Sequence, residues 1–320
     1  MCKKTKIWLI IASSLIALGL IILIIAISIT TSEHKNILAS KFETNSYDIN
    51  EKYSNISIIT DTADIKFVIS DSKKTTVVCY EQKNLIHSVS SKEGLLSIEV
   101  IDTRKWYEYI DINFINPTVT VYIPKGEYGN LTIKNNTGNI ELPKSLKFEN
   151  VDILENTGDV KNFANVSSEI KIKTSTGNIY MSDINANLIN LKVSTGKIEL
   201  SNIECANDIK ADVSTGKTYL SSIKCKNLTS SGNTGNLYLS NVVAADAFLL
   251  RRTTGDINLS ACDSNEMYIT TDTGDVSGTI LSEKVFITNT NTGDINVPKT
   301  INGGKCEITT STGDIKIKIN

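Results

Sequence analysis

The sequence predicts an all-β fold, a parallel β-solenoid that follows a single N-terminal transmembrane helix and a β-rich cap. Three observations lead to this prediction. A Thr-Gly pair recurs ten times, apolar and polar residues alternate on both sides of each pair, and residues 7–29 form one uncharged apolar run. The repeat glycines stand 19 or 20 residues apart, at positions 138, 158, 177, 196, 216, 235, 255, 274, 293 and 313. A period held this closely indicates one structural unit stacked on itself.

Each period carries the pattern of two short strands and leaves no room for a helix. Around Gly177, for example, Ile170, Ile172, Ile179 and Met181 alternate with polar residues. This alternation is typical of strands, and the Thr-Gly-Asp/Asn segment between them is typical of a turn. Copies of such a unit pair in parallel, so we expect a right-handed, β-helix-like rod of about ten rungs, roughly 45–50 Å long. Each rung should pair with the copy one period on, which would leave residues 315–320 in the exposed last rung.

The N-terminal residues predict where the chain lies in the cell. Residues 7–29 would span roughly 34 Å as a helix, enough for a bilayer core of about 30 Å. The lysines before this run favour a cytoplasmic N-terminus and an extracellular remainder. A cleaved signal peptide is the alternative, with a small-x-small site at residues 26–28. We therefore predict a cytoplasmic tail at 1–6, an anchor at 7–30, a linker at 31–45, a β-rich cap at 46–126 and the solenoid at 127–320.

The predicted cap contains a degenerate copy of the repeat and the most aromatic stretch of the chain. Residues 60–65 read Thr-Asp-Thr-Ala-Asp-Ile, with Ala63 in the glycine position. Residues 104–109 read Arg-Lys-Trp-Tyr-Glu-Tyr and could bind a partner through their aromatic rings. We favour a capping role, because terminal repeats must cover the open end of a solenoid.

Composition and motifs argue against a nucleic-acid-binding protein and against an enzyme. The net charge is −2, from 33 basic and 35 acidic side chains, whereas phosphate binding needs clustered Lys and Arg. The nucleophile-elbow, zinc-protease and P-loop strings are absent, and the chain has two histidines. We predict no catalytic residues and no cofactor. Arg251 and Arg252 near Asp256 offer one local resemblance to solenoid enzymes that cleave acidic polysaccharides, and we interpret them as a solvated cluster on an outer face.

Acidic residues that follow the repeat glycines are the candidate metal ligands. Four consecutive aspartates, about 4.8 Å apart if stacked, would repel one another unless they are solvated or share cations such as calcium. The structural interpretation is favoured, because Asp is common in turns. Lys197 and Lys217 occupy the same position earlier in the chain and interrupt the acidic edge. The calcium candidates are Asp256, Asp275, Asp294 and Asp314.

The threonines and cysteines of the repeat have structural interpretations. The Thr before each glycine could form a hydroxyl column that stabilises the turns. Paired columns could instead form an ice-binding face, but Glu155 and Arg252 would interrupt it. Cys262 and Cys306 occupy apolar positions and should be core residues. Cys205 and Cys225 could form a disulfide between neighbouring rungs, or could pack in the core like the alanines at the same position.

The repeats as a whole carry a family resemblance. The segment Val-Thr-Val-Tyr-Ile-Pro-Lys-Gly at 119–126, followed by Leu131 to Ile140 and the later Ser-Thr-Gly-Asp/Asn-Ile copies, resembles the bacterial putative-adhesin family of membrane-anchored β-strand-repeat proteins. The resemblance covers residues 45–320. It implies a right-handed β-helix-like fold on a cell envelope, and it implies no catalytic residues.

We therefore predict a membrane-anchored extracellular β-solenoid that acts without catalysis as a cell-envelope scaffold or an adhesin-like binding module. Its partner would be a cell-envelope polymer or a membrane or surface protein. The alternatives are a polysaccharide-acting enzyme on a β-helix scaffold and a component of an envelope-stress sensing system.

Overall fold

The computed structural model describes residues 12, 14–16, 18–22, 42–106 and 116–320. The predicted cytoplasmic tail, most of the predicted anchor and linker, and the aromatic residues 107–109 lie outside this set. Within the part of the chain that is described, no helix is long and apolar enough to cross a bilayer. From Phe42 onward the described residues form strands of one continuous sheet.

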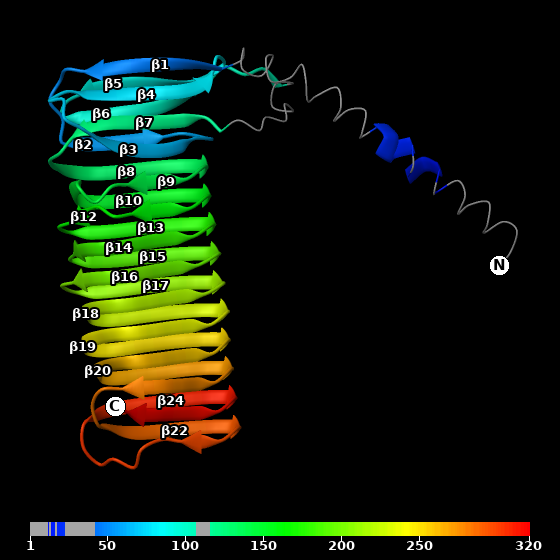
Figure 1. Cartoon of the computed structure of the whole chain (residues 1–320), viewed down its shortest axis with the longest axis vertical. Helices are drawn as coiled ribbons and strands as arrows, with labels where there is room; N and C mark the ends of the chain where they lie inside the picture. The colour runs from blue at the N-terminus through cyan, green and yellow to red at the C-terminus, as the bar shows by residue number, and fades with distance from the viewer. Residues whose placement is uncertain (1–11, 13, 17, 23–41, 107–115) are drawn as a thin grey trace, which may run out of the picture.

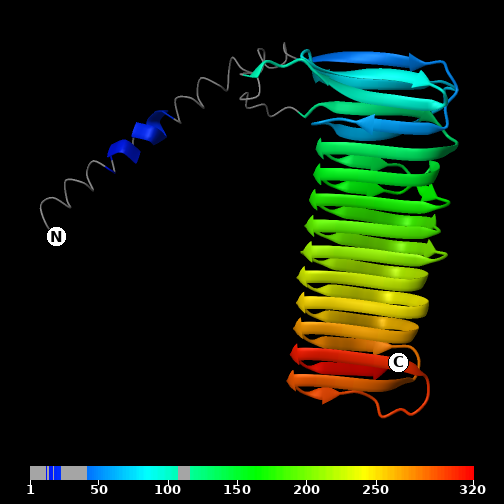
Figure 2. The same cartoon turned by 180° about the vertical axis from the view of Figure 1, so that it is seen from behind.

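The repeats form a parallel β-solenoid, as predicted. Strands from successive periods stack along a straight rod, in sequence order as far as β20, and Figures 1 and 2 show the rod from opposite sides. Its strands are β8 (Glu127–Thr137), β9 (Ile140–Leu142), β10 (Lys147–Thr157), β11 (Val160–Asn162), β12 (Asn165–Val166), β13 (Glu169–Thr176), β14 (Ile179–Ala186), β15 (Leu188–Thr195), β16 (Ile198–Cys205), β17 (Asp208–Thr215), β18 (Thr218–Thr234), β19 (Leu237–Thr254), β20 (Ile257–Thr273), β21 (Val276–Ile280), β22 (Lys284–Thr292), β23 (Ile295–Asn296), β24 (Gly304–Thr312) and β25 (Ile315–Ile319).

The register places like residues on like residues. Ile170 of β13 pairs with Ile189 of β15, which pairs with Ile209 of β17, and all three side chains are buried. Because side chains alternate across a strand, these inward columns are largely apolar while their neighbours point to solvent. The core is therefore a thin apolar column that runs the length of the rod.

The repeat glycine is required because successive turns touch. At Gly177 φ is +141°, and a Cβ there would lie 1.9 Å from the carbonyl oxygen of Gly158 one rung below. A positive φ of this size favours glycine, and a contact this close leaves no room for a Cβ. The two together exclude any side chain at this position. A second corner also needs positive φ, near +50° to +56°, at the non-glycine residues Asp183, Asn202, Ser222, Asn241 and Ala261.

The cap begins with the predicted degenerate rung and ends with antiparallel strands. Its strands are β1 (Phe42–Ile49), β2 (Asn55–Ile59), β3 (Asp64–Ser70), β4 (Thr75–Gln82), β5 (Leu85–Lys92), β6 (Leu95–Asp102) and β7 (Thr118–Pro124). Strands β2 and β3 stack in parallel on β8 and β9, and the Ala63 amide donates to the Thr137 carbonyl at 2.9 Å. Ala63 thus occupies the glycine position of an eleventh rung, as the sequence indicated.

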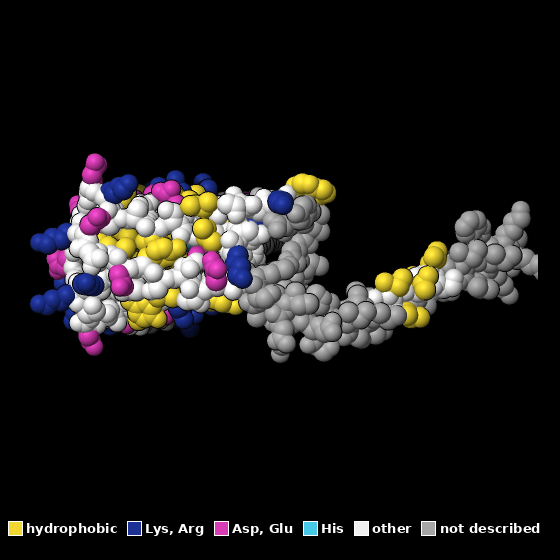
Figure 3. Space-filling view, turned by 90° about the horizontal axis from the view of Figure 1, so that it is seen from above, with side chains coloured by type: hydrophobic (Ala, Val, Ile, Leu, Met, Phe, Trp, Pro, Cys, Tyr) yellow, Lys and Arg dark blue, Asp and Glu magenta, His cyan; other side chains and the backbone are white. Residues whose placement is uncertain are grey.

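Beyond that rung the pairing of the strands changes from parallel to antiparallel. Strands β6 and β7 continue in parallel, whereas β5 pairs antiparallel with β6, and β4 pairs antiparallel with β7 and β1. Since β1 begins at Phe42, the linker predicted for 31–45 extends too far. Its last residues belong to the sheet because they alternate against β4, a partner distant in sequence. The end face carries apolar side chains between polar and charged ones (Figure 3).

The order of the last two rungs differs from the prediction. Strand β24 pairs with β20 on one side and with β22 on the other, so the final segment lies between two earlier rungs. Figure 1 shows β24 between β20 and β22. The exposed terminal rung is therefore β22 and β23, and residues 315–320 are not the open end.

Core composition explains this order. Inward positions of β24 hold Cys306 and Ile308, both buried, whereas the matching positions of β22 hold Phe286 and Thr288, both half-exposed. The more apolar rung gains more by being covered on both sides, because burial stabilises in proportion to apolar area. Gly304 permits the insertion, since a Cβ there would lie 1.7 Å from the carbonyl oxygen of Asn265.

Candidate binding surface

The residue after each repeat glycine joins one rung to the next. The side-chain oxygen of an Asp or Asn at this position accepts a hydrogen bond from the backbone amide of the equivalent residue one rung on. Examples are Asn139 to the Asp159 amide at 3.0 Å and Asp159 to the Asn178 amide at 2.9 Å. We call this column of side-chain-to-amide bonds the Asx ladder. It explains why the repeat prefers Asp or Asn after glycine.

The four calcium candidates are members of this ladder. Asp256 accepts from the Asp275 amide at 3.0 Å, Asp275 from the Asp314 amide at 2.8 Å, and Asp314 from the Asp294 amide at 2.8 Å. Their order along the rod follows the inserted rung, so Asp314 lies between Asp275 and Asp294. The amide of Asp294, and then Lys316 at 2.6 Å, hold the pKa of Asp314 below its usual range. Backbone amides thus supply a positive partner for the carboxylates of Asp256, Asp275 and Asp314, and calcium binding by the four stays a prediction.

Two lysines break the ladder in the middle of the rod. Lys197 and Lys217 occupy the position after glycine in consecutive rungs, where neither can accept a hydrogen bond through its side chain. The Lys197 amide still donates to Asn178 at 3.0 Å. The backbone amides of Lys217 and Asn236, in the next two rungs, therefore donate no hydrogen bond to the side chain of the preceding rung. Local rules of a repeat are most often broken where a surface has a further role.

A hollow lies beside these two lysines. It has a volume of about 420 Å³ and is lined by Asn178, Lys197, Glu199, Lys217 and Tyr219. We call it the tyrosine notch, because it opens in a column of residues three positions after each glycine. That column reads Tyr180, Glu199, Tyr219 and Tyr238 along the rod.

Contacts inside the tyrosine notch hold several of its side chains in place. The Lys197 ammonium lies 2.9 Å from Glu199 and 4.7 Å from the centre of the Tyr180 ring. The rings of Tyr219 and Tyr238 stack with centroids 5.0 Å apart and planes inclined by 7°. Lys217 is exposed and makes no ion pair with any residue that the structure describes. This surface was not predicted from the sequence. The signal that could have revealed it is the departure from the repeat at positions one and three after glycine.

The repeat forms a column of threonine hydroxyls inside the rod. The threonines of this column stand three positions before glycine, whereas the prediction assigned it to the threonines directly before glycine. Threonines three positions before glycine are buried and donate to the glycine carbonyl of the adjacent rung, as in Thr271 to Gly255 at 3.0 Å and Thr310 to Gly274 at 3.1 Å. The threonines directly before glycine are exposed. Only one member of each threonine pair therefore faces solvent, which removes the flat two-column face that ice binding requires.

Arg252 is not part of a solvated cluster, contrary to the prediction. It is 1% exposed, in the same inward column, and its guanidinium donates to Thr218 at 3.0 Å and to Ser230 at 3.2 Å. Burial lowers the pKa of Arg252 to about 10. Its position has the same parity as the apolar positions of the strand, so alternation turns it inward despite its charge. Arg251 precedes it on the outer face.

A buried polar network joins the strands of the cap. Glu81 lies 2.6 Å from His87 Nδ1, and His87 Nε2 lies 2.8 Å from the Thr60 hydroxyl. Asn45 donates to the other Glu81 oxygen at 2.8 Å. This hydroxyl–imidazole–carboxylate chain has the order of a hydrolase triad, but Thr60 is 5% exposed and faces the interior. We interpret the network as a cross-link between β1, β4, β5 and the end of β2.

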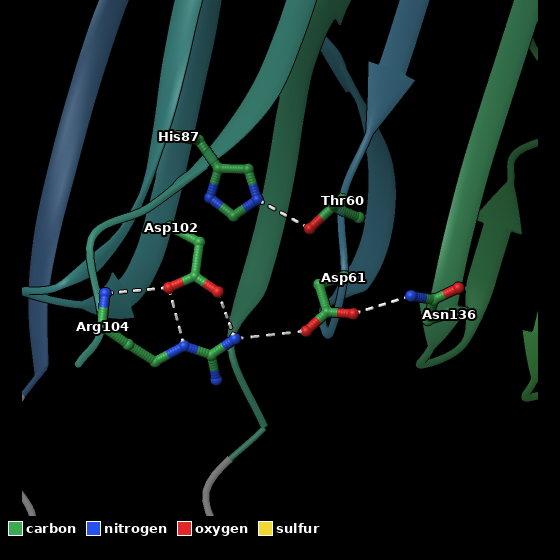
Figure 4. Close-up of polar contacts among 6 residues, drawn as sticks. All are labelled: Thr60, Asp61, His87, Asp102, Arg104 and Asn136. Carbon is green, nitrogen blue, oxygen red and sulfur yellow. Dashed lines mark hydrogen bonds and ion pairs between the residues drawn. The ribbon is translucent and has the colours of Figure 1, made fainter. Parts of the chain in front are cut away.

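Figure 4 shows the His87–Thr60 contact of that network beside a second network near the surface. Arg104 binds Asp102 at 2.7 Å and Asp61 at 3.5 Å, and Asp61 accepts from Asn136 at 2.7 Å. These contacts tie the end of β6 to the degenerate rung and to β8. Trp106, the described part of the predicted aromatic stretch, is 78% exposed.

The five cysteines that the structure describes are buried free thiols. Cys205 and Cys225 are 5% and 8% exposed and form no disulfide, and Cys262 and Cys306 lie in the core as predicted. Cys79, Glu81 and His87 place three possible metal-ligand atoms within 4.8 Å of one another. Burial raises the pKa of the Cys79 thiol to about 12, which keeps it neutral.

A larger hollow of about 780 Å³ lies at another corner, where Tyr128 and Phe148 form part of its lining. Its single lysine is already paired, since Lys147 binds Glu127 at 3.0 Å, and Glu149 adds a further negative charge to the lining. Tyr128 packs on Tyr53 and Phe148, which assigns these rings to the join between cap and rod. The tyrosine notch, with an unmatched lysine, is the better candidate for a ligand.

Stacked rungs, a degenerate first rung and an antiparallel end define a capped parallel β-solenoid repeat protein. Residues 53–216 and 204–320 match the family described as Toastrack DUF4097, and the chain belongs to this family. No curated protein matches the chain.

Several solved structures are similar to the chain at low sequence identity. A "putative adhesin" from Parabacteroides merdae is 10% identical, with 87% of this chain and 96% of that chain covered and a TM-score of 0.49. A "putative lipid binding protein" from Parabacteroides distasonis is 14% identical, with coverages of 86% and 97% and a TM-score of 0.49. A "putative adhesin" from Bacteroides fragilis is 14% identical, with coverages of 87% and 97% and a TM-score of 0.44.

Proposed function

We propose that this protein is a membrane-anchored, extracellular binding module of the cell envelope that acts without catalysis. The observation that carries the proposal is the tyrosine notch. Two consecutive rungs lack the Asx ladder, and they present Lys217 beside an aromatic column with no ion-pair partner among the residues that the structure describes. A purely structural rod would gain nothing from lysine at these two positions, because Asp or Asn at both would join the rungs better.

The rest of the rod supports binding more than chemistry. Its inward columns are packed, and the polar cap network that has the order of a catalytic triad is closed to solvent. A stiff stack of rungs holds the notch at a constant position, as binding sites on rigid elements require. The apolar run at 7–29, with lysines before it, would hold the rod outside the membrane.

Binding is tested by sedimentation of the full-length chain, purified in detergent, with insoluble cell-wall, membrane and host-matrix fractions. We expect the chain to pellet with at least one polymer fraction and to leave that polymer uncleaved. New reducing ends would make the protein an enzyme on polysaccharide, the first alternative. If the chain pellets with none of the polymers, the binding module is wrong, and co-purification from its own membrane then tests a role in envelope-stress sensing.

Location needs a separate experiment. Protease added to intact cells should remove the solenoid and leave a short membrane-bound fragment, whereas a cleaved signal peptide would release the solenoid into the medium. Protection of the solenoid in intact cells and its digestion only after lysis would contradict an extracellular location.

A further inference from the structure

We propose that the tyrosine notch binds one unit of an acidic glycan, a sugar that carries a carboxylate, phosphate or sulfate group. This inference rests on the proposed function and adds the chemical class of the ligand and the residues that hold it. Three features of the notch carry it: its shape, its hydrogen-bonding groups and its charge.

The shape follows from one short side chain in the aromatic column. Glu199 pairs with Tyr180 on one side and with Tyr219 on the other. Its smaller side chain leaves a recess against Tyr219, whereas Lys197 lies over the Tyr180 ring. One face of Tyr219 is covered by the stacked ring of Tyr238 at 5.0 Å. Its other face therefore turns toward the rung of Glu199 and forms a wall of the recess. The electron-rich face of an aromatic ring attracts the C–H groups of a sugar ring laid against it.

Hydrogen-bonding groups converge on the same recess. Lys197 binds one oxygen of Glu199 at 2.9 Å, which leaves the second oxygen of that half-exposed carboxylate to accept from sugar hydroxyls. The contact of Lys197 with the Tyr180 ring at 4.7 Å fixes the ammonium in this position. A pocket with an apolar wall and a few fixed polar groups is typical of small-ligand sites.

The charge of the recess selects an anionic ligand. Lys197 and Lys217 supply two positive charges and Glu199 one negative charge, which leaves a net charge of +1 among the lining residues. Lys197 is neutralised by Glu199, whereas Lys217 has no carboxylate partner in the described chain. Lys217 is therefore the group that would meet the acidic substituent of the sugar.

A serine column beside the notch suits an extended chain. Residues five positions after glycine stack in register on the same outer face, and each presents a hydroxyl to solvent: Ser182, Ser201, Ser221, Ser240 and Ser260. These hydroxyls can donate to and accept from successive sugar units. The glycan would lie along the rod, with its acidic unit in the notch.

The test compares an acidic oligosaccharide with its neutral counterpart. Oligogalacturonate, a phosphorylated galactose oligomer and a neutral galactose oligomer are titrated into the protein in detergent at low salt, and binding is measured by calorimetry. We expect an acidic probe to bind at least ten-fold more tightly than the neutral one. The carboxylate and phosphate probes distinguish the two sources of negative charge.

Variants of the notch locate the binding. Tyr219→Ala and Lys217→Ala should each weaken binding of the acidic probe at least ten-fold, with unchanged thermal unfolding. Tyr268→Ala is the matched control, because Tyr268 lies on another face with Lys305 over its ring at 5.0 Å. Equal binding of acidic and neutral probes, or equal loss in the control, would overturn the inference. If the notch variants still sediment with envelope polymer as the wild type does, the proposed function stands and the notch is not its site.

Discussion

The guanidinium of Arg252 fills the interior space that a side chain at Gly232 would occupy. A Cβ at Gly232 would lie 3.2 Å from Arg252 Cζ and 2.5 Å from the carbonyl oxygen of Val213. The two residues sit on adjacent rungs of β18 and β19, in the same inward column. A missing side chain in one rung thus accommodates an oversized one in the next, and the core stays filled.

This relationship predicts that the volume of Arg252 matters more than its charge. Arg252→Met should keep the space filled and remove a buried charge, whereas Arg252→Ala should leave a cavity beside Gly232. We expect the Met variant to be more stable than the Ala variant by about 2 kcal/mol or more. Chemical denaturation of both variants measures this difference. Equal stability of the two variants would show that the volume of this side chain contributes little.

Glu155 predicts a pH-dependent stability. It is fully buried in the same column as Arg252, and desolvation raises its pKa to about 7. Because the folded pKa lies above the unfolded value, the stabilisation is complete below pH 4.5 and is lost as the pH rises through 7. We expect the wild type to lose about 1–3 kcal/mol across this window.

Glu155→Gln should remove that slope and be more stable than the wild type at pH 8. Glu141→Gln, at an exposed position on the outer face, is the control and should keep the wild-type slope. Denaturation at pH 4.5, 6 and 8 distinguishes the variants. A slope that persists in Glu155→Gln would assign the pH dependence to another group.

Gly196 should tolerate no side chain. Its φ is +142°, and a Cβ would lie 1.9 Å from the carbonyl oxygen of Gly177. Gly196→Ala should therefore destabilise the rod by about 3 kcal/mol or more. At Gly126 the nearest atom to a Cβ would be 3.7 Å away, so Gly126→Ala should cost less than about 1 kcal/mol. Similar melting temperatures for the two variants would contradict the contact between turns.

The inserted rung can be tested by cross-linking. Cys306 pairs with Met267 on one side and with Phe286 on the other. Met267→Cys should form a disulfide with Cys306, since in-register neighbours lie about 4.8 Å apart, within the range for a disulfide. In a Cys306→Ser background, Met267→Cys and Phe286→Cys should fail to cross-link because β24 separates them. Efficient cross-linking of that pair, detected by peptide mass spectrometry, would restore the consecutive order.

Lys217→Asn should repair the Asx ladder. An Asn side chain at this position can accept from the Asn236 amide, as Asn236 itself accepts from the Asp256 amide at 3.0 Å. We expect a gain of about 0.5–1.5 kcal/mol in the free energy of unfolding, together with weaker binding of acidic glycan. Lys224→Asn, outside the ladder, should change neither. No gain in stability would show that the ladder contributes little at this rung.

The sequence by itself determined the solenoid, the rung at Ala63 and the core position of Cys262 and Cys306. The reason is that strand alternation and a constant spacing are local properties, and stacking of identical units follows from them. The parity of their positions would also have placed Arg252 and Glu155 inside the rod, but the prediction for Arg252 followed its charge and was wrong.

Tertiary structure alone decided which rung covers which. The segment from Gly304 to Ile319 carries the same repeat as its neighbours, so its local pattern fits several places in the stack. The difference between those places is the apolar area that remains exposed at the end of the rod, a quantity that belongs to the whole stack. The tyrosine notch also depends on the stack, because its lining brings together Asn178, Lys197, Glu199, Lys217 and Tyr219 from successive rungs.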